Sequence, residues 1–138
     1  MKRYATVAAL LVAGCVSAGG GSTVVHAPET GETHLRNVRQ LTYGGNNAES
    51  YFSRSGRQLI FQRQEKADEG CDQEYIMNID GSDMRRISNG LGRTTCGFFY
   101  DRDHRILYSS SFQHDKACPP RPDQSFGYVW PLGHLEIY

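Results

Sequence analysis

Short apolar runs, each ended by a polar turn, recur along the middle of this chain. Tyr75 to Ile79 is largely apolar, Asp80-Gly81 follows it, and a shorter run from Met84 to Ile87 comes next. An Asp-Gly pair between two such runs is a strong hairpin signal, because glycine readily adopts the positive φ that a tight turn needs. An isolated hairpin is only marginally stable in water, so further strands are expected to pack against it.

The apolar runs also repeat. "RQLT" from Arg39 has a counterpart in "RRIS" from Arg85, 46 residues later. "SYFSRSGRQLIFQ" from Ser50 has a counterpart in "GFFYDRDHRILYS" from Gly97, 47 residues later. The first copy predicts strands near 48–53, 58–63, 74–79 and 84–88, and "LEIY" at 135–138 resembles the third of these in the second copy.

The repeat predicts the fold class. Periods in the forties with four short strands per unit are typical of propeller blades. Both faces of 75–79 carry apolar residues, as expected for a sheet that is covered on each side. We therefore predict an all-β protein, a β-propeller of four-stranded antiparallel blades with about two blades present. A two-layer sandwich is the alternative, and it would show cleaner alternation.

The repeat resembles the TolB-type (WD40-like) propeller repeat. The family's usual form is serine-proline-aspartate-glycine, an apolar strand and then "MNADG…RRLT", and this chain has "SRSGRQLIF…YIMNIDGSDMRRIS". The turn "YDRD" of the second copy departs further, since it lacks both the serine and the glycine. The resemblance covers about residues 34 to 138 and implies the N-terminal part of a propeller. It is specific for fold and not for function, because such repeats occur both in binding proteins and in domains attached to peptidases.

The N-terminus predicts export. Lys2 and Arg3 precede a short apolar segment, 5–13, which is typical of a secretory signal and too short to span a bilayer. "VAGC" at 12–15 resembles the bacterial lipobox, so we predict a lipoprotein signal peptide over 1–14 and lipidation of Cys15. An ordinary signal peptide with an incidental Cys15 is the alternative. Residues 15–33 are rich in glycine, serine and threonine, which predicts a flexible tether before the propeller part at 34–138.

Three further cysteines lie in the exported part, where disulfides can form. The strand assignment puts Cys71 and Cys118 in equivalent loops and Cys96 at the connection between the two copies, so all three are predicted on one rim. We expect a Cys71–Cys118 disulfide, with Cys96 as an alternative partner. A zinc site on these thiols is the other alternative, although the chain has no CxxC pair.

Catalytic chemistry has little support in the sequence. The chain lacks G-x-S-x-G, H-E-x-x-H and P-loop motifs, so we predict no enzyme activity, no cofactor and no metal site. Fifteen basic residues balance fifteen acidic ones, so no nucleic-acid partner is expected. Arg85 and Arg86 could bind an acidic partner, but arginines on an outer strand more often form a solvated edge.

The insertion at 110–134 in the second copy is the predicted partner-binding loop. Prolines surround Arg121, Phe126, Tyr128 and Trp130, residue types that anchor interfaces. Alternatively, the aromatic residues cover a blade face. We thus expect a scaffold that binds a protein of the cell envelope and meets the membrane only through its lipid. It would be periplasmic and anchored to a bacterial membrane, with the outer membrane favoured. The alternative is a non-catalytic propeller domain at the N-terminus of a longer secreted peptidase, similar to prolyl oligopeptidase.

Overall fold

The computed structural model describes residues 23–66, 69–129 and 133–138, and among these residues it contains strands and no helix. The described part of the chain is therefore all-β, as predicted. The signal peptide, Cys15 and Trp130 lie outside the described residues.

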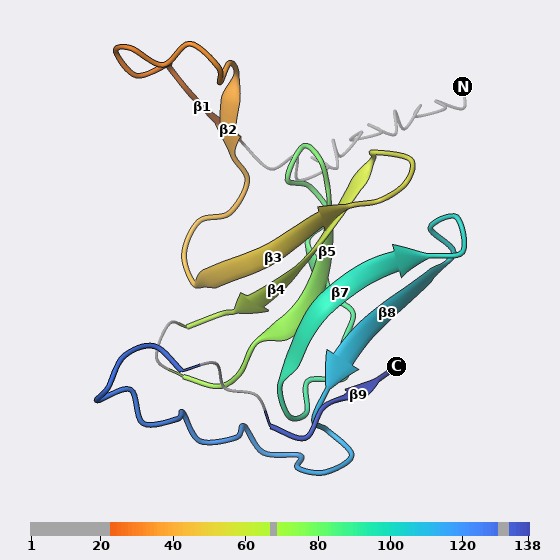
Figure 1. Ribbon diagram of the computed structural model, residues 1–138. Helices are drawn as coiled ribbons and strands as arrows, with labels where there is room; N and C mark the ends of the chain where they lie inside the picture. Colours follow the sequence, from red (N-terminus) through yellow and green to blue (C-terminus); the bar gives the residue numbers. More distant parts are fainter. Residues whose placement is uncertain (1–22, 67–68, 130–132) are drawn as a thin grey trace, which may run out of the picture.

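The described residues form nine strands in three antiparallel sheets (Figure 1). A hairpin comprises β1 (Val24–His26) and β2 (Val38–Gln40). The four-stranded first sheet comprises, in spatial order, β3 (Asn46–Phe52), β4 (Gln58–Gln64), β5 (Gln73–Asn78) and β6 (Arg85–Arg86). The three-stranded second sheet comprises β7 (Thr94–Tyr100), β8 (Arg105–Ser110) and β9 (Glu136–Ile137).

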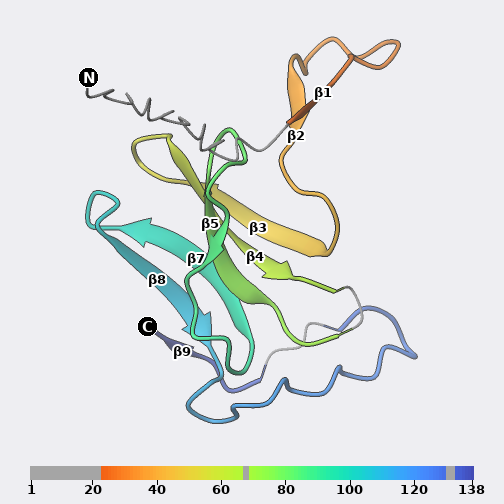
Figure 2. The same cartoon turned by 180° about the vertical axis from the view of Figure 1, so that it is seen from behind.

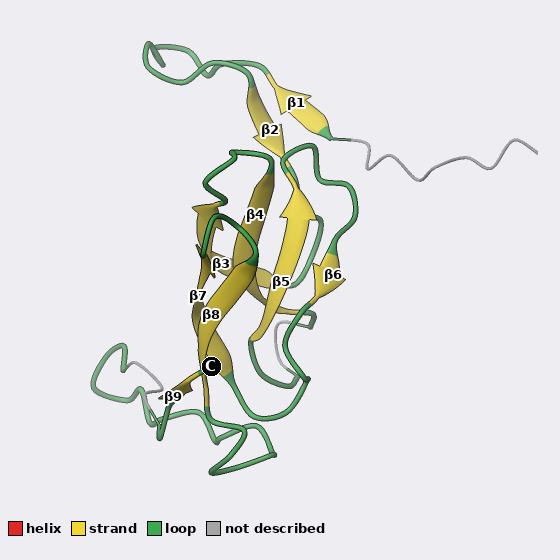
Figure 3. Ribbon diagram, turned by 90° about the vertical axis from the view of Figure 1, so that its right-hand side faces the viewer, coloured by secondary structure: helices red, strands yellow, loops and turns green. Residues whose placement is uncertain are grey.

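The strands agree with the repeat pattern except at the edges. β3, β4 and β5 lie within two residues of their predicted bounds, whereas β6 pairs over two residues only. β1 lies inside the segment 15–33, which we predicted to be a flexible tether. Residues 24–26 form a strand instead, because they pair with β2 from Val24↔Gln40 to His26↔Val38. The β1–β2 hairpin stands apart at one end of the molecule, and the long segment after β8 lies at the other end (Figure 3).

The Asp-Gly turn after β5 forms as its sequence predicts. Gly81 has a φ of 84°, and its N–H donates to the carbonyl of Asn78 at 2.8 Å. The Asp80 carboxylate accepts from the N–H of Ser82 at 2.9 Å, so both turn residues use the chemistry typical of their type. This turn returns the chain to place β6 along the outer edge of β5.

β5 is buried on both faces, which confirms the reading of its mixed apolar pattern. On one face Tyr75 and Met77 form a cluster with Leu59 and Phe61, and Leu41 packs against them. On the other face, Glu74 lies next to β7: a Cβ on Gly97 would be 2.5 Å from its Oε2 atom. Central strands that read as continuous apolar runs are covered on each side in this way.

The two larger sheets stack, with β7 against β3, β4 and β5 (Figure 2). Gly97 lets the sheets approach closely, because an added Cβ would also be 2.7 Å from Ile60 Cδ1. In the turn between β7 and β8, the Asp103 carboxylate accepts hydrogen bonds from the N–H groups of Arg54 at 2.7 Å and Ser55 at 2.9 Å. Asp103 thus links the two sheets, a contact between segments distant in sequence that the sequence analysis did not predict.

The two sheets repeat one another in detail. The β3–β4 pairing shifts register between Ala48 and Tyr51, and the β7–β8 pairing shifts between Thr95 and Phe98, 47 residues on. Each shift contains a residue with positive φ, Glu49 at 50° and Cys96 at 55°. Both sheets therefore share strand order, register and bulge position.

Candidate functional site

The Cys71–Cys118 disulfide joins the loop before β5 to the segment after β8. The two Cα atoms are 5.4 Å apart, and the sequence separation of 47 residues equals the repeat distance. The predicted pairing is confirmed, and a zinc site that needs all three thiols is ruled out because two of them are oxidised. Segments 69–72, 89–93 and 111–129 gather at this end of the sheets, and we call them the disulfide rim (Figure 2).

Cys96 does not belong to this rim, so that part of the prediction is wrong. It lies within β7 at the bulge, and its thiol is free and exposed. The polar run before it was read as a connection, but Thr94 and Thr95 already pair with Ser110 and Ser109 of β8. Strand pairing, which the local composition did not reveal, therefore starts two residues before the cysteine.

The longest segment of the disulfide rim, 111–129, which we call the rim loop, is hydrogen-bonded to the segment before β7 at its base and exposed at its tip. The N–H of Gly92 donates to the carbonyl of Lys116 at 2.9 Å, and the N–H of Ser111 donates to that of Arg93 at 3.0 Å. Phe126 is 101% exposed and Tyr128 is 70% exposed. Arg121 is exposed as well. Of the predicted anchors, the structure thus places these three on one exposed loop, while Trp130 lies outside the described residues.

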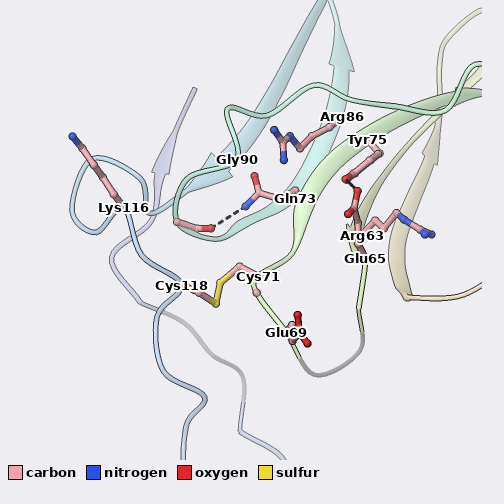
Figure 4. Close-up of a pocket in the computed structure, with 12 residues that line it drawn as sticks. Arg63, Glu65, Glu69, Cys71, Gln73, Tyr75, Arg86, Gly90, Lys116 and Cys118 are labelled. Atoms are coloured by element: carbon pink, nitrogen blue, oxygen red, sulfur yellow. Dashed lines mark hydrogen bonds between the residues drawn. A yellow bond between two sulfur atoms is a disulfide. The ribbon is translucent and has the colours of Figure 1, made fainter.

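A cavity of about 320 Å³ opens beside the disulfide, between the β4–β5 loop, β6 and the segment before β7 (Figure 4). Its lining is largely polar and carries both signs of charge. The lining residues are Arg63, Glu65, Glu69, Gly70, Cys71, Gln73, Tyr75, Arg86, Gly90, Gly92, Lys116 and Cys118. The sequence analysis identified the disulfide and Arg86 separately, but not this cavity, because its walls come from segments that are distant in sequence.

The floor of the cavity is fixed by hydrogen bonds. Gln73 donates through Nε2 to the carbonyl of Gly92 at 2.9 Å and accepts from the Ser88 hydroxyl at 2.7 Å. The Tyr75 hydroxyl donates to Glu65 Oε1 at 2.6 Å. Burial and this bond to Glu65 raise the pKa of Tyr75, so the phenol stays protonated at neutral pH.

Glu74 is the most unusual ionisable group of the first sheet. Its side chain is fully buried between the sheets, and neither oxygen makes a hydrogen bond of normal geometry to the described residues. Burial and then the nearby charge of Asp72 raise its pKa to about 7, although the N–H of Gly97 opposes part of the rise. The group faces protein on every side that the structure describes, so we read it as a structural liability of the sheet interface.

In the described part of the chain, no three His, Cys, Asp or Glu side chains are grouped so as to hold a metal ion. His114 and His134 lie with ring centroids 5.0 Å apart, and His114 Nε2 is 3.3 Å from Glu136 Oε1. His114, His134 and Glu136 are all exposed, and they lie after β8 in the chain. Their contacts are pairwise.

The fold and the rim together define an all-β protein of two stacked repeat sheets joined by a disulfide. No family model, curated protein or solved structure matches the chain. Within the described residues, no helix has the length and apolar character to cross a membrane. The disulfide fits an oxidising compartment outside the cytoplasm, in agreement with the predicted export.

Proposed function

We propose that this protein is an exported, lipid-anchored scaffold built on a TolB-like β-propeller, and that it binds a protein of the bacterial envelope through the disulfide rim. It has no catalysis of its own. Lipid on Cys15 would hold it at the periplasmic side of a membrane, with the outer membrane favoured, and residues before β1 would act as the tether. The exposed aromatic loop tied down by Cys71–Cys118 is the observation that carries the binding proposal.

The propeller part of the proposal is supported by the way the second sheet repeats the first. Ile60 of the first sheet is fully buried beneath β7, whereas its counterpart in the repeat, Leu107, is 39% exposed. A further sheet of the same kind would cover this face as the second sheet covers the first, and successive coverage of this type is how propeller blades stack.

The binding part is supported by the chemistry and anchoring of the loop. Exposed aromatic side chains with an arginine are typical interface anchors, and Phe126 and Tyr128 are largely exposed on the loop that also carries Arg121. The disulfide, three prolines of the loop and the Asp123 carboxylate, which accepts from Ser125 N–H at 2.9 Å, restrict the loop before binding. Such restriction lowers the entropy cost of forming an interface.

Site-specific photocrosslinking in living cells tests the proposal. A photoreactive phenylalanine analogue replaces Phe126 or Tyr128, and the matched controls are Phe52 and Tyr100. The controls are 70% and 54% exposed and lie at the ends of β3 and β7, away from the disulfide rim. We expect discrete adducts with one envelope protein from the two rim positions only. Equal adducts at all four positions, or none at the rim positions, would overturn the proposal.

A further inference from the structure

The two arginines of β6 point to opposite faces of the first sheet. Arg86 pairs with Tyr75 and Arg85 pairs with Ile76, and directly paired residues in an antiparallel ladder share a face. Arg86 therefore shares the face of Tyr75 and lines the rim cavity, whereas Arg85 faces away from it. Adjacent identical side chains thus have different environments.

Only one of the two guanidinium groups is neutralised. Arg85 forms an ion pair with Asp83 two residues earlier. Among the residues that the structure describes, Arg86 has no ion-pair or hydrogen-bond partner, which leaves its donors available to a ligand. An arginine can present two parallel N–H groups to a carboxylate, which is the strongest common form of charge-assisted hydrogen bond.

The backbone beside Arg86 is shaped to hold the guanidinium in the cavity. Gly90 has a φ of 85°, and a Cβ at this position would be 3.0 Å from Arg86 Cζ and Nη2. A side chain at this position would displace the guanidinium, and the positive φ itself favours glycine. In Figure 4 the Arg86 head group points toward Gly90 and lies above Gln73.

The charge balance of the cavity favours an anionic group. Glu69 is neutralised by Lys66 at 2.7 Å, and one oxygen of Glu65 is engaged by Tyr75. Arg63 also lines the cavity, but in Figure 4 its guanidinium points away from it, and the group donates to the carbonyl of Gly44 and to Asn47 Oδ1. Of the remaining charged groups in the lining, Arg86 and Lys116 are positive and Glu65 is negative, so the balance is positive.

We propose that the rim cavity binds the carboxylate of an aspartate or glutamate side chain of a protein partner, with Arg86 as the bidentate donor. This inference rests on the proposed function, because only that function makes the ligand part of a protein. The cavity adds the chemical group that the disulfide rim recognises. The Glu65 carboxylate disfavours a second negative charge, so the site discriminates for a single carboxylate placed against Arg86.

Nuclear magnetic resonance titration of the oxidised protein with a small probe tests the site without a partner. The probe is N-acetyl-glutamate methylamide, and its neutral analogue N-acetyl-glutamine methylamide is the ligand control. We expect saturable shifts of the Arg86 Nε–H and Gly90 N–H signals with the acidic probe only. Arg86→Gln should weaken binding by about 10-fold or more, since hydrogen bonds to charged groups contribute about 1.5–3 kcal/mol.

Arg85→Gln is the matched control, because it removes the neighbouring arginine on the opposite face, and it should leave binding within about twofold of the wild type. Glu65→Gln should tighten binding because it removes a like charge. This second variant tests the site even if Arg86→Gln disturbs the fold. Absence of saturable shifts in the wild type, or equal losses in the Arg85 and Arg86 variants, would overturn the inference. Because no partner is present, failure here is distinct from failure of the crosslinking test.

Discussion

Replacing Glu74 with glutamine tests the central electrostatic feature of the sheet interface. The carboxyl is fully buried, and its pKa is raised from an ordinary 4.5 to about 7. The folded protein therefore keeps this proton until about pH 7, whereas the unfolded chain loses it near pH 4.5. Between these values the folded state binds more protons, so this group makes the free energy of unfolding fall as pH rises.

The size of the effect follows from the difference in pKa. A shift of about 2.5 units corresponds to about 3 kcal/mol at 1.36 kcal/mol per unit, and the whole of it is lost once the pH exceeds about 8. This loss would be a large fraction of the stability of a small domain, which is about 5–15 kcal/mol. Glutamine does not ionise, so the variant lacks this component at every pH.

Urea unfolding of the oxidised protein, followed by far-UV circular dichroism at several pH values from 4.5 to 8, measures the effect. The difference in unfolding free energy between Glu74→Gln and the wild type should rise by about 3 kcal/mol across this range. A constant offset from the buried amide cancels in this slope. Glu29→Gln, at an exposed glutamate, is the control and should run parallel to the wild type. Parallel curves for Glu74→Gln as well would refute the reasoning.

Three further predictions concern the disulfide, the sheet contact and the anchor. The double variant Cys71→Ala/Cys118→Ala opens a closure of 47 residues and should lose about 4 kcal/mol of unfolding free energy in urea, by the chain-entropy estimate; the same midpoint before and after the change would contradict it. Gly97→Ala places a methyl group 2.5 Å from Glu74 Oε2 and should destabilise by about 1–3 kcal/mol, seen as a lower Tm, whereas Gly133→Ala, which meets nothing within 4 Å, should leave the Tm unchanged. Metabolic labelling with palmitate should mark the wild type and leave Cys15→Ser unmarked, and label on the variant would exclude lipidation at this cysteine.

The periodicity of the chain was sufficient to predict most of the strands. β4 and β5 follow from apolar runs bounded by Ser-Gly and Asp-Gly turns, whose conformations depend on local residues. The repeat also placed Cys71 and Cys118 in equivalent loops, and their disulfide follows from that equivalence. β6 was predicted too long, because an edge strand is limited by its pairing with β5 and not by its own apolar content.

Other features depended on the register of pairing between distant segments. A slip of one residue between β5 and β6 would exchange the faces of Arg85 and Arg86, so the sequence alone could not separate a paired surface arginine from one that lines a cavity. Cys96 was misplaced for a similar reason, since the bulge in β7 is set by its alignment with β8.

The sequence by itself determined the repeat, the strand pattern, the turn chemistry and the two cysteines that join the copies, because each depends on residues close together or on a fixed period. Only the tertiary structure decided how the sheets meet. Burial of Glu74 and the close approach at Gly97 arise where two sheets stack, and the rim cavity arises where three loops converge. Burial and charge balance depend on all neighbours in space. Those neighbours come from distant parts of the chain, so they can be identified only in the folded structure.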